Sequence, residues 1–202
     1  MGYIVAILGA YLLGCSNMAL YLAKMKNVDL GGGSGNPGTS NATLLMGWRA
    51  GILVGIHDIG KGVLAVIVAE LCFPELAHIG AVAGVACVLG HIFPVFMKFR
   101  GGKGFASYLG MTLALNWKFA LIILAMVVIV TLITDYIVVG TVTTVVAVPV
   151  ALGLFSQSVI LPVILCVATG VILYKHRENY VRIWKGTEIG LSSAFKGKHR
   201  VK

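Results

Sequence analysis

Long apolar runs constrain this chain more than any other feature of its sequence. A helix needs about 20 residues to cross the roughly 30 Å hydrocarbon core of a bilayer. The seven runs are 3–23, 60–74, 76–97, 105–117, 119–134, 136–155 and 158–175. Only 11% of the residues are charged, against about 25% in a typical soluble domain, which excludes a soluble enzyme and a disordered chain. We predict an all-α, polytopic integral membrane helix bundle of about seven transmembrane helices, built as one domain over residues 1–202.

The net charge of +9 predicts the orientation of this bundle. Three polar stretches separate the runs, namely 24–43, 98–104 and 176–202. If the N-terminus lies outside and all the runs cross, these stretches and most basic residues fall on the cytoplasmic side, as the positive-inside bias requires. The run 105–117 is the shortest, because its residues rise only about 20 Å as a helix. We therefore predict an outside N-terminus and a cytoplasmic C-terminus.

Two further segments have positions of their own. Residues 44–57 are apolar but interrupted by Arg49 and by glycines, which predicts a partly inserted helix leading into the second span. Residues 192–202 form a basic tail on the cytoplasmic side. This tail either touches anionic lipid head groups or is a plain solvated terminus, and the sequence leaves both open.

A glycine-rich stretch over residues 31–41 is the first candidate for chemistry. It reads GGGSGNPGTSN, with five glycines, one proline and several small hydrogen-bonding side chains. Glycine allows the backbone to take positive φ and to approach a ligand closely, and exposed N–H groups in such turns bind anions. The alternative is a flexible loop without a ligand.

A second stretch, residues 90–104, combines glycines with basic side chains. Arg100 and Lys103 bracket two glycines, and a third glycine follows. Backbone N–H groups beside a lysine ammonium suit a phosphate, although no Ser or Thr follows the lysine as a Walker A loop requires. The alternative is a basic turn that anchors two helices at the membrane face.

The remaining ionisable candidates lie in residues 175–188 and around position 60. If the third stretch is helical, His176, Asn179 and Arg182 share one face, and histidine can act as acid or base near neutral pH. The alternative is a juxtamembrane amphipathic helix. Asp58 and Lys61 lie inside an apolar run, where ionisable residues are functional candidates, but their i, i+3 spacing also lets them pair with each other.

The chain has no sequence motif for a metal or a cofactor. It lacks H-E-x-x-H, C-x-x-C and a cluster of acidic residues that would bind Mg²⁺. We therefore predict no metal and no cofactor, no nucleic-acid partner, and a cationic, glycine-lined site at one membrane face. Its substrate is expected to be anionic, phosphorylated and partly lipidic. The oligomeric state stays open.

Together the three stretches resemble one family, the bacterial acyl-phosphate:glycerol-3-phosphate acyltransferases of the PlsY type. The matching segments are GSGNPGTSN at 33–41, GHIFP at 90–94, FRGGKGFAS at 99–107, HRENYVR at 176–182 and GTE at 186–188. The resemblance implies an enzyme that moves a fatty acyl group from acyl phosphate to the 1-hydroxyl of sn-glycerol 3-phosphate. The products would be lysophosphatidic acid and phosphate. It also implies a bacterial inner-membrane protein whose active site faces the cytoplasm.

The resemblance assigns roles to individual residues. The implied catalytic set comprises Ser34, Asn36, Lys103, His176 and Asn179. The implied substrate-binding set comprises Gly33, Gly35, Gly38, Ser40, Asn41, Asp58, Lys61, His91, Gly101, Gly102, Gly104, Ser107, Arg182 and Glu188. In this scheme the turn 101–104 holds the acyl-phosphate head group, and Lys61, Arg182 and His176 hold glycerol 3-phosphate.

The chain departs from the family pattern in one charged position. The family often has an arginine three residues after the asparagine of its first motif, where this chain has Leu44. Arg49 is the nearest arginine, two turns away if the segment is helical. A competing class is a membrane transporter or channel for a phosphorylated solute, which also uses polar glycine loops at membrane depth.

Overall fold

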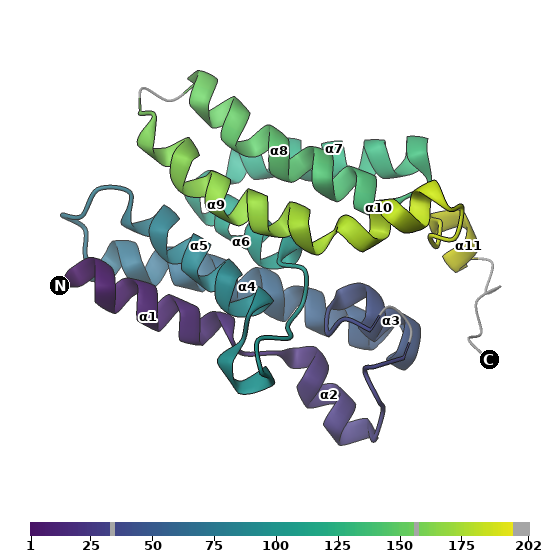
Figure 1. Cartoon of the computed structure of the whole chain (residues 1–202). Helices are drawn as coiled ribbons and strands as arrows, with labels where there is room; N and C mark the ends of the chain where they lie inside the picture. Colours follow the sequence, from purple (N-terminus) through teal and green to yellow (C-terminus); the bar gives the residue numbers. More distant parts are fainter. Residues whose placement is uncertain (33–34, 156–157, 196–202) are drawn as a thin grey trace. The chain divides into compact units, whose positions relative to one another are not determined.

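The computed structural model describes residues 1–32, 35–155 and 158–195, and all regular secondary structure in these ranges is helical. This confirms the all-α prediction for the described part of the chain. The chain packs as two compact units that meet in sequence between Trp117 and Lys118. Figure 1 follows the helices in chain order.

The first unit holds the N-terminal helices, and the second holds those from the boundary onward. In the first unit the elements are α1 (Gly2–Gly14), α2 (Met18–Lys26), α3 (Thr39–Met46), α4 (Trp48–Cys72), α5 (Ile79–Ile92), a short 3-10 helix (Val95–Met97) and α6 (Phe105–Leu115). From the boundary onward they are α7 (Trp117–Thr134), α8 (Ile137–Phe155), α9 (Ile160–Lys175), α10 (Arg177–Trp184) and α11 (Leu191–Phe195).

Within the residues that the structure describes, five helical segments are long and apolar enough to cross a membrane. They are Gly2–Lys26, Trp48–Cys72, Ile79–Met97, Trp117–Thr134 and Ile137–Phe155. A sixth is present if α9 and α10, which meet at an angle of 43°, form one bent span. The apolar helix α6 has 11 residues and rises only about 17 Å. A polytopic membrane bundle is thus confirmed, while a count of seven and the orientation of the termini stay predictions.

The start of the second span differs from the sequence prediction. Gly47, at φ 87°, separates α3 from α4, and α4 then continues unbroken from Trp48 to Cys72. The predicted helix over 44–57 is thus not a separate element: residues 48–57 are helical and lead into the second span as the start of α4, while residues 44–46 belong to α3. Glycine weakens a helix interior by about 1 kcal/mol, but Gly51 packs directly on α3, where an added Cβ would meet the side chain of Thr43. Close packing on α3 accounts for glycine at this position within a continuous helix.

Glycines also set the helix crossings of the first unit. Gly14 and Gly90 lie where α1 packs on α5, and Gly62 and Gly110 lie where α4 packs on α6. A Cβ added at any of the four would meet a backbone carbonyl of the neighbouring helix. Small residues that let two backbones approach are a common way to pack helices in membranes.

In the second unit, α8 and α9 run side by side (Figure 1), and the hydroxyl of Thr169 on α9 donates to the carbonyl of Val145 on α8 at 2.8 Å.

The start of the predicted basic tail is bonded to the connection between α7 and α8. The carboxylate of Asp135, between α7 and α8, accepts from the backbone N–H of Ser192 at 2.8 Å and from its hydroxyl at 2.7 Å. The rest of the predicted basic tail, residues 196–202, lies outside the described residues.

Candidate active site

The first glycine-rich stretch is closed by hydrogen bonds of its own. Gly33 and Ser34 lie outside the described residues. Asn41, which is 1% exposed, donates from its side chain to the carbonyl of Leu30 at 3.0 Å and so joins the two ends of the loop. At the centre of the loop, Gly38 donates to the carbonyl of Asn36 at 2.9 Å. Asn41 thus closes the loop from a buried position at the start of α3.

A second tie holds this loop to the break between α1 and α2. Asn17 lies in that break and is buried. Its side-chain oxygen accepts from the N–H of Leu20 at 2.9 Å, which caps α2. Its side-chain nitrogen donates to the carbonyl of Pro37 at 3.2 Å. One amide side chain therefore fixes both the start of α2 and the glycine-rich loop.

The glycine turn after α5 uses two of its amides internally. The N–H of Gly101 donates to the carbonyl of Ile92 at 3.1 Å, and the N–H of Gly102 donates to the carbonyl of His91 at 3.1 Å. These carbonyls belong to the end of α5, where helix geometry leaves them without intrahelical partners. The end of α5 therefore takes both amides, while the assignment of the turn 101–104 to a phosphate stays a prediction.

The start of α6, at residues 103–107, has features that suit the binding of an anion. Gly104 adopts a left-handed conformation at φ 91°, and no side chain caps the helix that begins at Phe105. The first N–H groups of a helix lack intrahelical partners and carry partial positive charge. Ser107, in this first turn, is fully buried, and its hydroxyl has no partner among the described residues. The half-buried Lys103 immediately precedes Gly104, so this helix start has the composition of an anion site.

Asp58 and Lys61 form an ion pair inside the first unit. The Lys61 ammonium lies 3.0 Å from a carboxylate oxygen of Asp58, and the two side chains are 2% and 3% exposed. The same ammonium donates to the carbonyl of Gly14 at 3.0 Å and to that of Ser16 at 2.7 Å. The prediction that these two residues pair with each other is confirmed, and Lys61 also reaches the α1–α2 break.

Two histidines extend this pair. Nδ1 of His91 lies 2.8 Å from the Lys61 ammonium and 3.4 Å from the Asp58 carboxylate. Nδ1 of His57 lies 3.3 Å from the same carboxylate, and the hydroxyl of Ser16 lies 2.9 Å from Nε2 of His57. We call Ser16, His57, Asp58, Lys61 and His91 the buried polar cluster. Sequence reasoning did not assign a role to Ser16 or His57; for Ser16 the signal was the polar pair at 16–17, which interrupts an apolar run.

The second unit holds a separate polar trio. Glu188 accepts from the side-chain nitrogen of Asn179 at 2.8 Å and from Nε of Arg182 at 2.6 Å. Gly186, at φ 65°, turns the chain so that the N–H groups of 187 and 188 both donate to the carbonyl of Arg182. The prediction that Asn179 and Arg182 share a helix face is confirmed, and their common partner is Glu188.

His176 lies where α9 bends into α10. The two helices meet at 43°, and the buried imidazole is bonded through Nδ1 to the carbonyl of Ile172 at 2.8 Å. A carbonyl only accepts, so Nδ1 carries the hydrogen. In the neutral ring Nε2 is then the basic atom.

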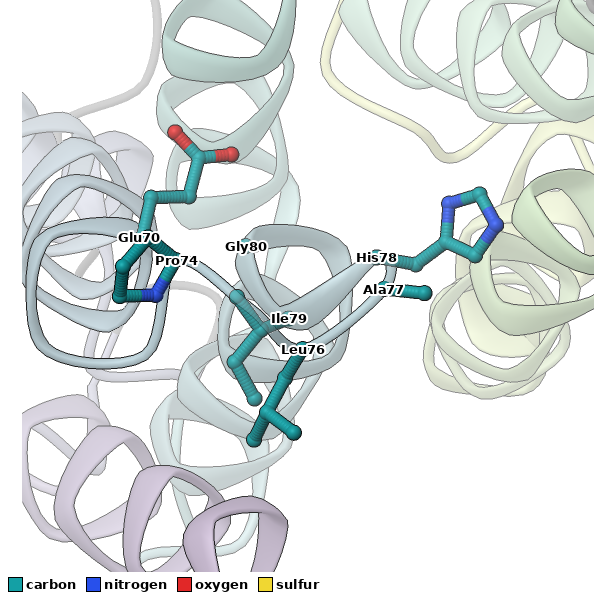
Figure 2. Close-up of a pocket in the computed structure, with 7 residues that line it drawn as sticks. All are labelled: Glu70, Pro74, Leu76, Ala77, His78, Ile79 and Gly80. Carbon is teal, nitrogen blue, oxygen red and sulfur yellow. The ribbon is translucent and has the colours of Figure 1, made fainter.

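An open pocket of about 450 Å³ lies at the other end of α4, around its connection to α5. Figure 2 shows its lining residues, with Glu70 and His78 on opposite sides of the connection. None of the predicted site residues lines this pocket. Within the described ranges, no group of three or more His, Cys, Asp and Glu side chains could hold a metal ion.

Most of the chain is similar to known proteins. The family profile of glycerol-3-phosphate acyltransferase matches residues 4–186, which span both units. This chain belongs to the glycerol-3-phosphate acyltransferase family. It is 33% identical to glycerol-3-phosphate acyltransferase 1 of Oceanobacillus iheyensis, over 96% of this chain and 98% of that one. It is 37% identical to a glycerol-3-phosphate acyltransferase of Coxiella burnetii, over 93% and 97%.

Two solved structures of the family have the same fold. Both are crystal structures of PlsY, an integral membrane glycerol 3-phosphate acyltransferase, and both are 32% identical to this chain. The glycerol 3-phosphate form matches with a TM-score of 0.88 over 94% of this chain and 96% of that one. The lysophosphatidic acid form matches with a TM-score of 0.84 over 94% and 95%. The PlsY-type membrane fold and family therefore hold for this chain.

Against the family pattern, the missing arginine has no replacement on the same helix. Leu44 lies on α3, whereas Arg49 lies on α4 beyond the break at Gly47. The guanidinium carbon of Arg49 is 5.4 Å from the ring centroid of Trp48, a distance that fits a cation–π contact. The condition for placing Arg49 on a shared helix with Leu44 is therefore not met, because the helix is interrupted at Gly47.

Proposed function

We propose that this family member transfers a fatty acyl group from acyl phosphate to the 1-hydroxyl of sn-glycerol 3-phosphate, releasing lysophosphatidic acid and inorganic phosphate. Family membership supports an acyltransferase with glycerol 3-phosphate as acceptor. The related PlsY structures, in a glycerol 3-phosphate form and a lysophosphatidic acid form, support the acceptor and the product. The choice of acyl phosphate as donor needs separate support from this chain's own residues.

The observation that carries the donor assignment is the start of α6. The hydroxyl of Ser107, in the first turn of α6, is buried and has no partner among the described residues. No side chain caps this helix. A phosphate seated there would receive helix N–H groups, this hydroxyl and the ammonium of Lys103. When acyl phosphate reacts, negative charge grows on the departing phosphate, and fixed donors at that position stabilise it.

We assign the acceptor to the polar trio of the second unit and to His176. Arg182 is held by Glu188 through Nε, and we assign its Nη groups to the phosphate of glycerol 3-phosphate, since guanidinium matches phosphate oxygens in pairs. Asn179 is bonded to the same carboxylate. Glu188 thus fixes the orientation of both side chains.

The transfer needs no acyl-enzyme, because acyl phosphate is already activated. The 1-hydroxyl oxygen of glycerol 3-phosphate attacks the acyl carbon, the bond from that carbon to the phosphate oxygen breaks, and its electron pair leaves with the phosphate. The hydroxyl proton goes either to Nε2 of His176 or to a substrate phosphate oxygen. Turnover of His176→Ala at saturating substrates separates the two, since unchanged turnover removes His176 as the base.

We also propose that the enzyme is a multi-pass protein of the bacterial inner membrane with its site on the cytoplasmic side. The basic residues of the polar stretches support this orientation through the positive-inside bias. Cysteine accessibility to a membrane-impermeant reagent tests it. Labelling of a cysteine placed at Lys98 from the periplasmic side of intact cells would contradict it.

Phosphate release in detergent micelles tests the reaction itself. With acyl phosphate and glycerol 3-phosphate, the purified protein should release phosphate and form lysophosphatidic acid, and neither should appear when the acceptor is omitted. Acyl-CoA and acyl carrier protein thioesters serve as comparison donors. Transfer from a thioester with none from acyl phosphate would overturn the donor assignment. Micelles enclose no compartment, so a transporter would give no signal in this assay.

A further inference from the structure

The buried polar cluster joins segments that lie far apart in the sequence of the first unit. Ser16 comes from the α1–α2 break, His57, Asp58 and Lys61 from α4, and His91 from the end of α5. Buried polar groups are expensive unless all of them are bonded. Every member of this cluster has a partner within it.

The Lys61 ammonium is fully occupied by protein atoms. It has three hydrogens and faces four acceptors within 3.0 Å, which are the carbonyls of Gly14 and Ser16, Nδ1 of His91 and the carboxylate of Asp58. The two carbonyls lie where α1 ends, so the ammonium also meets the negative end of that helix. An ammonium placed in this way clamps the α1–α2 break and has no hydrogen left for a substrate phosphate.

Three of the four acceptors around Lys61 can take a hydrogen from the ammonium. When Nδ1 of His91, at 2.8 Å, is one of the three, Nε2 carries the hydrogen of the neutral ring. That Nε2 edge faces Gly102, where an added Cβ would collide with it. The carbonyl of His91 also accepts from the N–H of Gly102 at 3.1 Å. The imidazole ring and the carbonyl of His91 therefore both contact Gly102, in the turn that carries Lys103.

The other side of the cluster reaches the glycine-rich loop. Lys61 holds the carbonyl of Ser16 at 2.7 Å, and the adjacent Asn17 donates to the carbonyl of Pro37 at 3.2 Å. His57 bridges the hydroxyl of Ser16 to Asp58. The cluster is thus bonded, directly or through one residue, to both glycine segments of the first unit.

We propose that the buried polar cluster positions these two glycine segments relative to each other, and that His91 is the positioning residue through which it holds the turn 101–104. This inference rests on the proposed function for its link to acyl phosphate. The resemblance implies that Asp58, Lys61 and His91 contact the substrate. We instead assign these three residues to positioning the turn 101–104 through contacts with protein atoms.

Hydrogen exchange and kinetics of two His91 variants test the proposal. His91→Asn keeps an acceptor near Nδ1 for Lys61 but empties the space under Gly102, whereas His91→Gln places an amide near the position of Nε2. We expect His91→Asn to raise amide exchange over residues 98–106 by about tenfold and the KM for acyl phosphate by about tenfold, with the KM for glycerol 3-phosphate nearly unchanged. His91→Gln should recover most of both. The matched control is His78→Asn at the other end of α5, with neither change expected.

A pair of substitutions that enlarges residue 102 and shrinks residue 91 tests the contact between His91 and Gly102. Gly102→Ala should displace the imidazole, and combining it with His91→Ala should relieve the clash, so the double variant should exchange more slowly at 98–106 than Gly102→Ala alone. Strictly additive effects, or exchange in His91→Asn equal to that in His78→Asn, would overturn the proposal even in an active enzyme. If the exchange results hold but wild-type protein transfers nothing from acyl phosphate, the proposed donor fails and the positioning of the turn stands.

Discussion

The ammonium of Lys61 lies 3.0 Å from the carboxylate of Asp58, one helical turn earlier on α4, and both side chains are almost wholly buried. Such a pair is a weak source of net stability, but breaking it leaves an uncompensated charge in a dry environment. Removing either partner alone therefore leaves the other charge buried and unpaired, so the effects of the two single changes are not additive.

We expect Lys61→Met and Asp58→Asn each to destabilise the folded protein by about 3–5 kcal/mol. In Lys61→Met the carbonyls of Gly14 and Ser16 also lose their donor. The Asp58→Asn/Lys61→Met double variant should be less destabilised than the sum of the singles. Unfolding in detergent measures this, with the exposed Lys24→Met as control. A Lys61→Met variant as stable as wild type would contradict the role of the Lys61 ammonium in holding Asp58 and the carbonyls of Gly14 and Ser16.

Ser107→Ala should weaken activity without weakening stability. An unpaired buried hydroxyl is unfavourable by about 1–3 kcal/mol, so its removal is expected to leave the melting temperature unchanged or raised. If the hydroxyl serves the acyl-phosphate head group, the KM for that substrate should rise about tenfold in the same variant.

The control for Ser107→Ala is Thr131→Val on α7, the second buried hydroxyl without a partner among the described residues. Thr131→Val should also leave the melting temperature unchanged or raised, and it should keep full activity. Equal kinetics for Ser107→Ala and wild type would remove the hydroxyl from the donor site.

Glu188→Gln should weaken the acceptor side alone. The substitution keeps the shape of the side chain but removes the charge that holds Arg182 at 2.6 Å. Bonds to charged groups contribute about 1.5–3 kcal/mol, so the KM for glycerol 3-phosphate should rise at least about tenfold while the KM for acyl phosphate changes little. Initial rates at varied acceptor measure it. Glu178→Gln is the control, because that exposed carboxylate only approaches Arg177 at 3.7 Å.

Two glycines on α4 should respond in opposite ways to alanine. A Cβ at Gly62 would meet the carbonyl of Ser107 on α6, whereas a Cβ at Gly60 has no atom within 4 Å. Gly62→Ala should destabilise by about 1–3 kcal/mol through overpacking, and Gly60→Ala should stabilise by up to about 1 kcal/mol through helix propensity. Thermal unfolding of both variants decides, and equal melting temperatures would contradict the close crossing of α4 and α6.

Local patterns in the sequence predicted what local geometry controls. The i, i+3 spacing of Asp58 and Lys61 indicated their ion pair, and the same spacing of Asn179 and Arg182 indicated their shared face; the structure confirms both. The apolar runs indicated the membrane bundle, because length and hydrophobicity suffice for that inference. None of these steps required knowing which helices touch.

Contacts between distant segments could not be read from spacing. The reach of Lys61 to the carbonyls of Gly14 and Ser16 crosses more than forty residues and depends on how α1 packs against its neighbours. The amides of Gly101 and Gly102 looked available to a phosphate, because only the fold shows that α5 ends against them. The unbroken course of α4 through Gly51 depends in the same way on packing against α3.

Glu188 lies beyond the end of α10, yet its carboxylate accepts from Asn179 and Arg182 on that helix. The segment after α10 is therefore tied back to the helix by its side chain as well as by its main chain. A substitution at position 188 thus alters the surroundings of two helix side chains at once.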